Sequence, residues 1–169
     1  MARPLVYWDA NAFLALLNQD KSASELADCQ SVWDAAERGE LFIVTSTFTN
    51  AEVIYMKGVP KLDPVNRLKV NNFFRKPFIV QYPVTRFISE LARDVVWDTT
   101  TKPKDAVHVA TAGFHKIRLL HTFDGPLLTA SAIDVAGFTV ECRKPSWQKQ
   151  QVIPYEATKL VDGSEEDLE

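Results

Sequence analysis

The amino-acid sequence predicts a three-layer α/β/α sandwich whose central sheet is mostly parallel and has about five strands. Two observations predict this fold. Short uninterrupted apolar runs, such as residues 5–8, are typical of strands that are buried on both faces of a parallel sheet. Between these runs, apolar residues recur three and four positions apart, as expected for helices that cover such a sheet.

The first strand and the helices after it have clear boundary signals. Residues 5–8 form the strand, and Asp9 suits the N-cap of the next helix, because a carboxylate there accepts hydrogen bonds from free backbone N–H groups. A second helix is expected to begin at Ser22, which forms a capping-box pattern with Glu25. Gly39 is its expected end, since glycine commonly terminates helices.

The next expected elements are a strand and two helices. Residues 41–44 form the strand, and the helix after it runs to Gly58 with Glu52 near its middle. A basic helix follows at about 62–74, with Val65 on its apolar side.

The second half of the chain repeats the alternation. Pro103 fits the first position of a helix, because proline lacks the N–H that would have no partner there. The expected elements are a strand at 78–82, a helix at 83–95 with Phe87 on its apolar face, a helix from Pro103, a strand at 119–122, a short helix at 126–135 and a strand at 138–141.

Length and composition fit one globular domain. The chain has 169 residues, of which 46% are apolar, and this is enough to bury a core. We expect residues 1–142 to form the domain and residues 143–169 to form a C-terminal extension with a disordered acidic end. The sequence has no membrane span, signal-peptide pattern or disulfide framework, so we expect a cytoplasmic protein with no membrane partner.

The formal net charge of −3 is unevenly distributed. The last eight residues hold five acids, and residues 1–161 carry 19 basic against 17 acidic residues. Residues 57–76 contain six basic residues and a single acidic one, Asp63. Such a stretch is typical of a solvated helical face, and it could equally follow a phosphate backbone.

Four carboxylates stand alone in apolar parts of the chain: Asp9, Glu52, Asp105 and Asp124. Each has an ordinary structural interpretation, as a helix cap, a first-turn acid, a turn residue or an exposed helix residue. However, Asp9 and Asp124 directly follow expected strands, and Asp105 opens the helix that leads to the second of them. Ligands bind beyond the carboxyl ends of strands in open α/β sheets, so the joint occurrence favours a shared site.

Convergence of these carboxylates would require neutralisation. Two carboxylates about 5 Å apart repel by about 3 kcal/mol at an effective dielectric constant of 20. Several such pairs are a large penalty against a domain stability of about 5–15 kcal/mol. Oxygen ligands without nearby His or Cys select Mg²⁺ or Mn²⁺. An acidic site with such an ion beside a basic surface suits phosphodiester cleavage.

Four motifs in order resemble those of PIN domains. Residues 9–11 resemble the family's D-x-[SN] opening, and residues 50–53 resemble its helical glutamate segment. Residues 105–110 are similar to its D-a-x-h-x-A helix start, and residues 120–124 to its h-x-T-x-D strand end. The resemblance covers about residues 3–140.

The resemblance implies a parallel five-stranded sheet and a Mg²⁺- or Mn²⁺-dependent ribonuclease. It also implies a VapC-like toxin with RNA as substrate and an antitoxin as partner, and it suggests a homodimer. In that case Asp9, Asp105 and Asp124 would bind metal, Glu52 would complete the cluster, and Asn11 and Thr122 would orient carboxylates by hydrogen bonds. Candidate contacts to RNA are Lys104, Arg86, Lys69 and Arg75. His108 is more often a packed helix histidine than a substrate contact.

Two other functions remain open at this stage. A phosphatase of the haloacid-dehalogenase type also begins with Asp after its first strand, but it requires a second acid where this chain has Asn11. The other is a non-catalytic PIN-like module that binds RNA or protein. Retention of all four acids argues against that module, because their repulsion would serve no purpose there.

Overall fold

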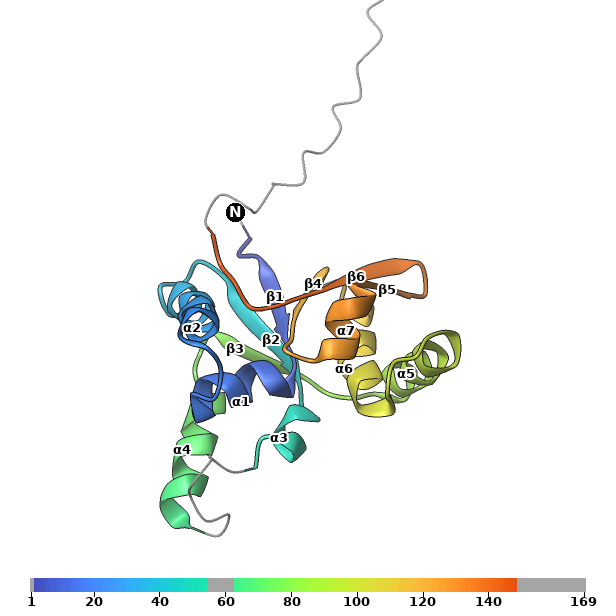
Figure 1. Cartoon of the computed structure of the whole chain (residues 1–169). Helices are drawn as coiled ribbons and strands as arrows, with labels where there is room; N and C mark the ends of the chain where they lie inside the picture. Colours follow the sequence, from blue (N-terminus) through green and yellow to red (C-terminus); the bar gives the residue numbers. More distant parts are fainter. Residues whose placement is uncertain (1, 55–62, 149–169) are drawn as a thin grey trace, which may run out of the picture.

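The computed structural model describes residues 2–54 and 63–148 of the chain. In these residues a six-stranded sheet lies between two layers of helices (Figure 1). The strand order is β3-β2-β1-β4-β6-β5, and all neighbours are parallel except β5 and β6. The strands are β1 (Leu5–Trp8), β2 (Phe42–Ser46), β3 (Ile79–Tyr82), β4 (Leu119–His121), β5 (Ala132–Val135) and β6 (Phe138–Arg143). The helices are α1 (Ala10–Asn18), α2 (Ala23–Glu37), α3 (Thr49–Glu52), α4 (Pro64–Phe74), α5 (Arg86–Asp98), α6 (Pro103–Phe114) and α7 (Gly125–Ala130).

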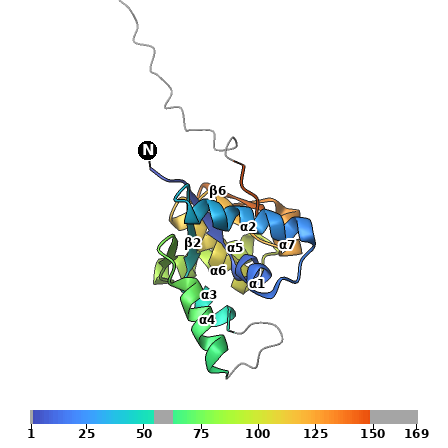
Figure 2. The ribbon, with the colours of Figure 1, turned by 90° about the vertical axis from the view of Figure 1, so that its left-hand side faces the viewer.

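The alternation of side chains along β1 divides the core into two halves. Val6 and Trp8 pack with α1 and α2 on one face of the sheet, whereas Tyr7 packs with α5 and α6 on the other. All three side chains are at most 2% exposed. Figures 1 and 2 show α1 and α2 on one side of the sheet and α5 and α6 on the other, with α4 extending beyond the sheet. The predicted three-layer, mostly parallel fold is therefore confirmed.

The chain changes direction across the sheet at β1. After β1 the chain adds β2 and then β3 to one side of β1 in the sheet. It then crosses to the other side of β1, where the strands lie in the order β4, β6, β5. The register pairs Trp8 with His121, and the backbone N–H of Asp9 donates to the carbonyl of His121 at 3.3 Å. The carboxyl ends of β1 and β4 therefore lie side by side. In a doubly wound sheet this reversal point is where ligands bind.

The sheet has one strand more than expected, because the predicted helix at 126–135 is wrong in its second half. That segment alternates between exposed and buried positions along Ala132–Val135, which is a strand pattern. Ala136 and Gly137 both have positive φ, at 50° and 83°, so they form the type of two-residue turn that closes an antiparallel hairpin. The backbone N–H of Gly137 donates to the side chain of Asp134 at 3.0 Å and supports this turn. The strand expected last, at 138–141, is therefore β6.

Three helix predictions are also corrected. Helix α3 has only four residues and ends at Glu52, so this acid is terminal rather than central, and the predicted end at Gly58 lies outside the described residues. Val65 and Phe87 are 56% and 70% exposed, so neither lies on a buried face. In α4 the buried residues are Asn66 and Val70 instead. The apolar spacing failed here because α4 extends past the sheet and only a narrow stripe of it contacts the core.

The beginning of the C-terminal extension is attached to the domain. The indole N–H of Trp147 donates to Glu40 at 3.0 Å, and the Lys144 ammonium lies 2.8 Å from Glu25 on α2. Trp147 also packs against the core that α1 and α2 share. Within the described part of the chain, no helix has the length and apolar character that a membrane crossing needs.

Gly113 is the position where α6 approaches β5 most closely. A Cβ added there would lie 2.5 Å from Cβ of Val135. We expect Gly113→Ala to lower the free energy of unfolding by about 1–3 kcal/mol, because overpacking outweighs the better helix propensity of alanine. A urea titration measures the change. Gly125→Ala is the matched control, because no atom lies within 4 Å of an added Cβ there. Equal losses in both variants would contradict the packing argument.

Candidate active site at the carboxyl ends of β1 and β4

Asp9 is a buried carboxylate at the point where the sheet reverses. It is the N-cap of α1, and its Oδ1 accepts from the backbone N–H of Ala12 at 3.0 Å. Its Oδ2 accepts from the hydroxyl of Thr122 at 2.5 Å. The residue is only 2% exposed, and burial raises its pKa to about 6 although both hydrogen bonds lower it. Asp9 is thus a helix cap with an unfavourable charge.

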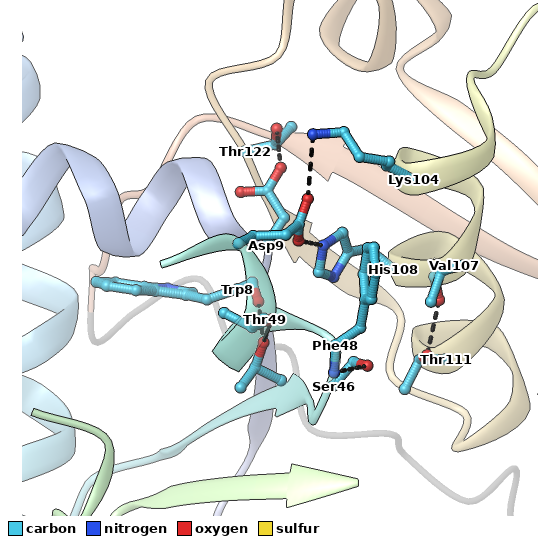
Figure 3. A network of polar contacts seen from close by, with 12 residues as sticks. Trp8, Asp9, Ser46, Phe48, Thr49, Lys104, Val107, His108, Thr111 and Thr122 are labelled. Atoms are coloured by element: carbon cyan, nitrogen blue, oxygen red, sulfur yellow. Dashed lines mark hydrogen bonds and ion pairs between the residues drawn. The ribbon is translucent and has the colours of Figure 1, made fainter. Parts of the chain in front are cut away.

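Thr122 connects Asp9 to the loop that carries Asp124. Its hydroxyl donates to Asp9 and also accepts from the backbone N–H of Asp124 at 2.9 Å. Asp124 in turn caps α7, because its Oδ2 accepts from the backbone N–H of Leu127 at 3.1 Å. Thr122 is completely buried just after β4, so a single hydroxyl fixes both acidic segments. Figure 3 shows Thr122 beside Asp9.

Glu52 is held by two side chains of α6. Its Oε2 lies 2.6 Å from Nε2 of His108, and its Oε1 lies 3.5 Å from the ammonium of Lys104. Nδ1 of His108 is 2.9 Å from the hydroxyl of Tyr7, and His108 is only 2% exposed. Figure 3 shows Lys104 and His108 extending from α6 toward the end of β1 that carries Asp9. These contacts turn Glu52 inward, although sequence alone allowed an exposed helix residue.

The proton positions in this chain of contacts depend on the charge of His108. Burial is the main cause that raises the pKa of Tyr7, so its phenol keeps its proton. When the imidazole of His108 is neutral, the carboxylate of Glu52 can only accept, so Nε2 must carry the hydrogen. Nδ1 then accepts from the phenol. Sequence reasoning missed Tyr7 altogether. The signal for His108 was its spacing of three from Asp105, which places both on one face of α6.

Asp105 brings the remaining carboxylates into electrostatic contact. Its pKa is raised first by burial and then by the charges of Asp124 and Glu52, while His108 and Lys104 lower it. The charge of Asp105 also raises the pKa of Asp9. The four predicted acids come from different elements and lie close enough to affect one another. The fold therefore brings together four carboxylates that are far apart in the sequence.

The other predicted site residues lie at varied distances from this cluster. Asn11 is exposed on α1, and among the described residues its side chain makes no hydrogen bond to a carboxylate. Arg86 pairs with Glu90 on α5 at 2.9 Å. Lys69 is exposed on α4, and Arg75 is exposed directly after that helix. Of the four predicted RNA contacts, Lys104 is the one that the described chain places against a cluster residue.

The donor chemistry of the cluster suits a hard divalent ion. All four groups are carboxylates, and their repulsion, seen in the pKa of Asp105, is what a cation would relieve. Within residues 2–54 and 63–148, however, no three His, Cys, Asp or Glu side chains are already arranged to hold a metal ion. Asp9, Glu52 and Asp124 direct oxygens at protein donors instead. Their remaining lone pairs are the ones that a metal would use.

Comparison with known proteins points to one family. The model of the PIN domain family matches residues 6–129, which include all four carboxylates. No curated protein matches the chain significantly.

Several solved structures share the fold. The Mycobacterium tuberculosis toxin VapC20, described as cleaving the sarcin-ricin loop, has a TM-score of 0.54 and 16% identity over 74% of this chain and 94% of that chain. A toxin–antitoxin complex from Klebsiella pneumoniae has a TM-score of 0.51 and 18% identity over 85% of this chain and 99% of that chain. VapBC2 from Rickettsia felis, bound to a promoter DNA fragment, has a TM-score of 0.58 and 12% identity over 83% and 98%.

The hydroxyl of Thr122 can be tested by its effect on Asp9. We expect Thr122→Val to lower the free energy of unfolding by about 1–3 kcal/mol, because the buried carboxylate of Asp9 loses its donor and the partly buried N–H of Asp124 loses its acceptor. The pKa of Asp9 should rise further, since the lost hydrogen bond lowers it in the native chain. Carboxyl NMR titration and urea unfolding measure the two effects. Thr122→Ser retains the hydroxyl and should behave like the wild type, and the proposed bridge is wrong if it does not.

Asp9 should make the metal-free domain less stable as the pH rises. An unfolded Asp has a pKa of about 3.9, and in the fold the pKa of Asp9 is raised to about 6. Between these values the unfolded chain has lost the proton that the native chain retains, so stability falls with rising pH, by about 3 kcal/mol in total. Urea titrations in EDTA from pH 4 to 7 would measure this, with the decline weaker in Asp9→Asn. Identical pH slopes would rule out Asp9 as a source of the effect.

Proposed function

Because the chain belongs to the PIN domain family, we propose that it is a metal-dependent endoribonuclease that cleaves RNA phosphodiester bonds as the toxin of a toxin–antitoxin pair. The observation that carries this proposal is the arrangement of the four carboxylates. Thr122 joins Asp9 to the segment of Asp124, and Glu52 contacts Lys104 and His108 on the helix that carries Asp105. The charges of Asp124 and Glu52 accordingly raise the pKa of Asp105. A protein gains nothing from such repulsion unless a cation or proton offsets it.

Asp9, Asp105 and Asp124 are the residues that would hold Mg²⁺ or Mn²⁺. When bound, such an ion polarises a phosphate and lowers the pKa of water, which supplies hydroxide at neutral pH. The protein's own contribution is orientation. Thr122 fixes the carboxylate of Asp9, and His108 fixes that of Glu52.

Lys104 supplies positive charge next to the acids. Its side chain is 71% exposed, although its ammonium approaches Glu52. An exposed ammonium on a flexible stem can turn toward an RNA phosphate without a large desolvation cost. Lys104 is thus the basic residue best placed to receive the substrate at this edge.

An antitoxin is the expected protein partner. The solved complex from Klebsiella pneumoniae pairs a toxin with an antitoxin. The VapBC2 structure from Rickettsia felis carries a name that denotes both proteins. A nuclease with this fold would need such control if its RNA target is essential. Co-expression of the chain with the protein encoded beside it, followed by co-purification, would test the pairing.

Metal dependence can be measured on the intact chain. We expect Mn²⁺ to raise the melting temperature, because an ion that binds only the native state stabilises it by mass action. Asp9→Asn and Asp105→Asn should lose this shift. RNA cleavage should fall by more than the roughly 10–100-fold that loss of an outer-shell partner costs. Asp28→Asn, which changes an exposed carboxylate on α2, is the matched control and should retain both properties.

The result that would reject this function is also clear. If Mn²⁺ leaves the melting temperature unchanged and the chain still binds RNA, the non-catalytic PIN-like module is favoured instead.

A further inference from the structure

A cavity of about 390 Å³ is lined by residues of α3, α4 and the edge strand β3 and by the residues that end the two helices. The polar residues that line it are Asn50, Asn71, Arg75 and Gln81. None of the four predicted carboxylates lines it. The nuclease chemistry therefore leaves this cavity unexplained.

Two of the amides are locked to each other. The side-chain NH₂ of Asn50 donates to Oε1 of Gln81 at 3.1 Å, and that of Gln81 donates to Oδ1 of Asn50 at 3.0 Å. With respect to residues 2–54 and 63–148, each amide retains a second N–H and a second lone pair, because an amide has two donors and two acceptor sites. The reciprocal bonds fix the orientation of both groups. The pair therefore presents a preorganised edge of donors and acceptors, of the kind that reads the edge of a nucleobase.

The rest of the lining completes a site for a nucleotide. Val53, Val70 and Phe74 provide apolar surface, and the ring of Phe74 is held by packing against Phe13 at a centroid distance of 5.0 Å. Apolar and aromatic surface can cover the face of an unstacked base. Arg75, which directly follows α4, adds a positive charge that suits phosphate, and it belongs to the strongly basic stretch of residues 57–76.

The position of the cavity relates it to the carboxylates. Asn50 lines the cavity and Glu52 belongs to the cluster, and both lie on the four-residue helix α3. A single short helix thus contributes to both places. Asn50 and Glu52 are only two residues apart on this helix, so α3 connects the two places directly.

We propose that this cavity binds an unpaired nucleotide of the RNA substrate, with the Asn50–Gln81 pair contacting its base and Arg75 contacting its phosphate. This inference rests on the proposed ribonuclease function, because it assigns a substrate-recognition site to that activity.

The test uses the wild-type chain in EDTA with AMP, GMP, CMP and UMP as probes, since these contain no phosphodiester bond to cleave. NMR would follow the side-chain NH₂ signals of Asn50 and Gln81. We expect at least one monophosphate to shift these signals saturably, and Gln81→Ala and Arg75→Ala each to weaken binding about tenfold. Gln30→Ala removes an exposed amide on α2 and should bind like the wild type.

Ribose 5-phosphate distinguishes base recognition from simple anion binding. It should bind at least about tenfold more weakly and leave the amide signals unshifted. The inference is overturned if none of the four monophosphates moves these signals, or if ribose 5-phosphate moves them equally. Because the titration needs neither metal nor cleavage, it separates the two proposals. RNA cleavage without nucleotide binding would reject the cavity alone, and nucleotide binding without cleavage would reject the nuclease.

Discussion

The hydrogen bond between Thr122 and Asp9 is the interaction on which the site depends. It joins the ends of β1 and β4, the two strands between which the chain reverses its path across the sheet. The same hydroxyl supports the backbone of Asp124, so the distance between two acidic segments is set by one side chain. Burial of this hydroxyl excludes water from the contact and strengthens it. The fold thus fixes the segments that carry these two carboxylates relative to each other.

The remaining acids are balanced by α6 rather than by the sheet. Glu52 contacts His108 and Lys104, and Asp105 lies on the first turn of the same helix. One helix therefore supplies both a carboxylate and the groups that orient another. The phenol of Tyr7, in the middle of β1, completes the connection from the core to Glu52. The geometry of the cluster is consequently tied to the packing of α6 on the sheet, where Gly113 permits close contact with β5.

Helix α3 links this cluster to the neighbouring cavity. Its four residues are too few for a stable isolated helix, so tertiary contacts must determine its position. Thr49 is buried and shares a hydrogen bond with Thr45 at the end of β2, and Asn50 is bonded to Gln81 on β3. Glu52 is bonded to α6. A short segment anchored at both ends therefore holds a fixed position between the carboxylate cluster and the cavity.

The layered fold and the cap at Asp9 could be predicted from the sequence, and the four acids could be selected as a candidate site, because apolar periodicity, capping and isolated charges are local properties of the chain. The inward orientation of Glu52 depends on tertiary contacts, because its partners His108 and Lys104 are more than fifty residues away in the sequence. The tertiary structure also decided the burial of α4 and α5, which depends on how far each helix extends over the sheet. The hairpin of β5 and β6 could not be predicted from the sequence either. A short apolar segment fits a helix or a strand until a neighbouring strand provides hydrogen-bond partners.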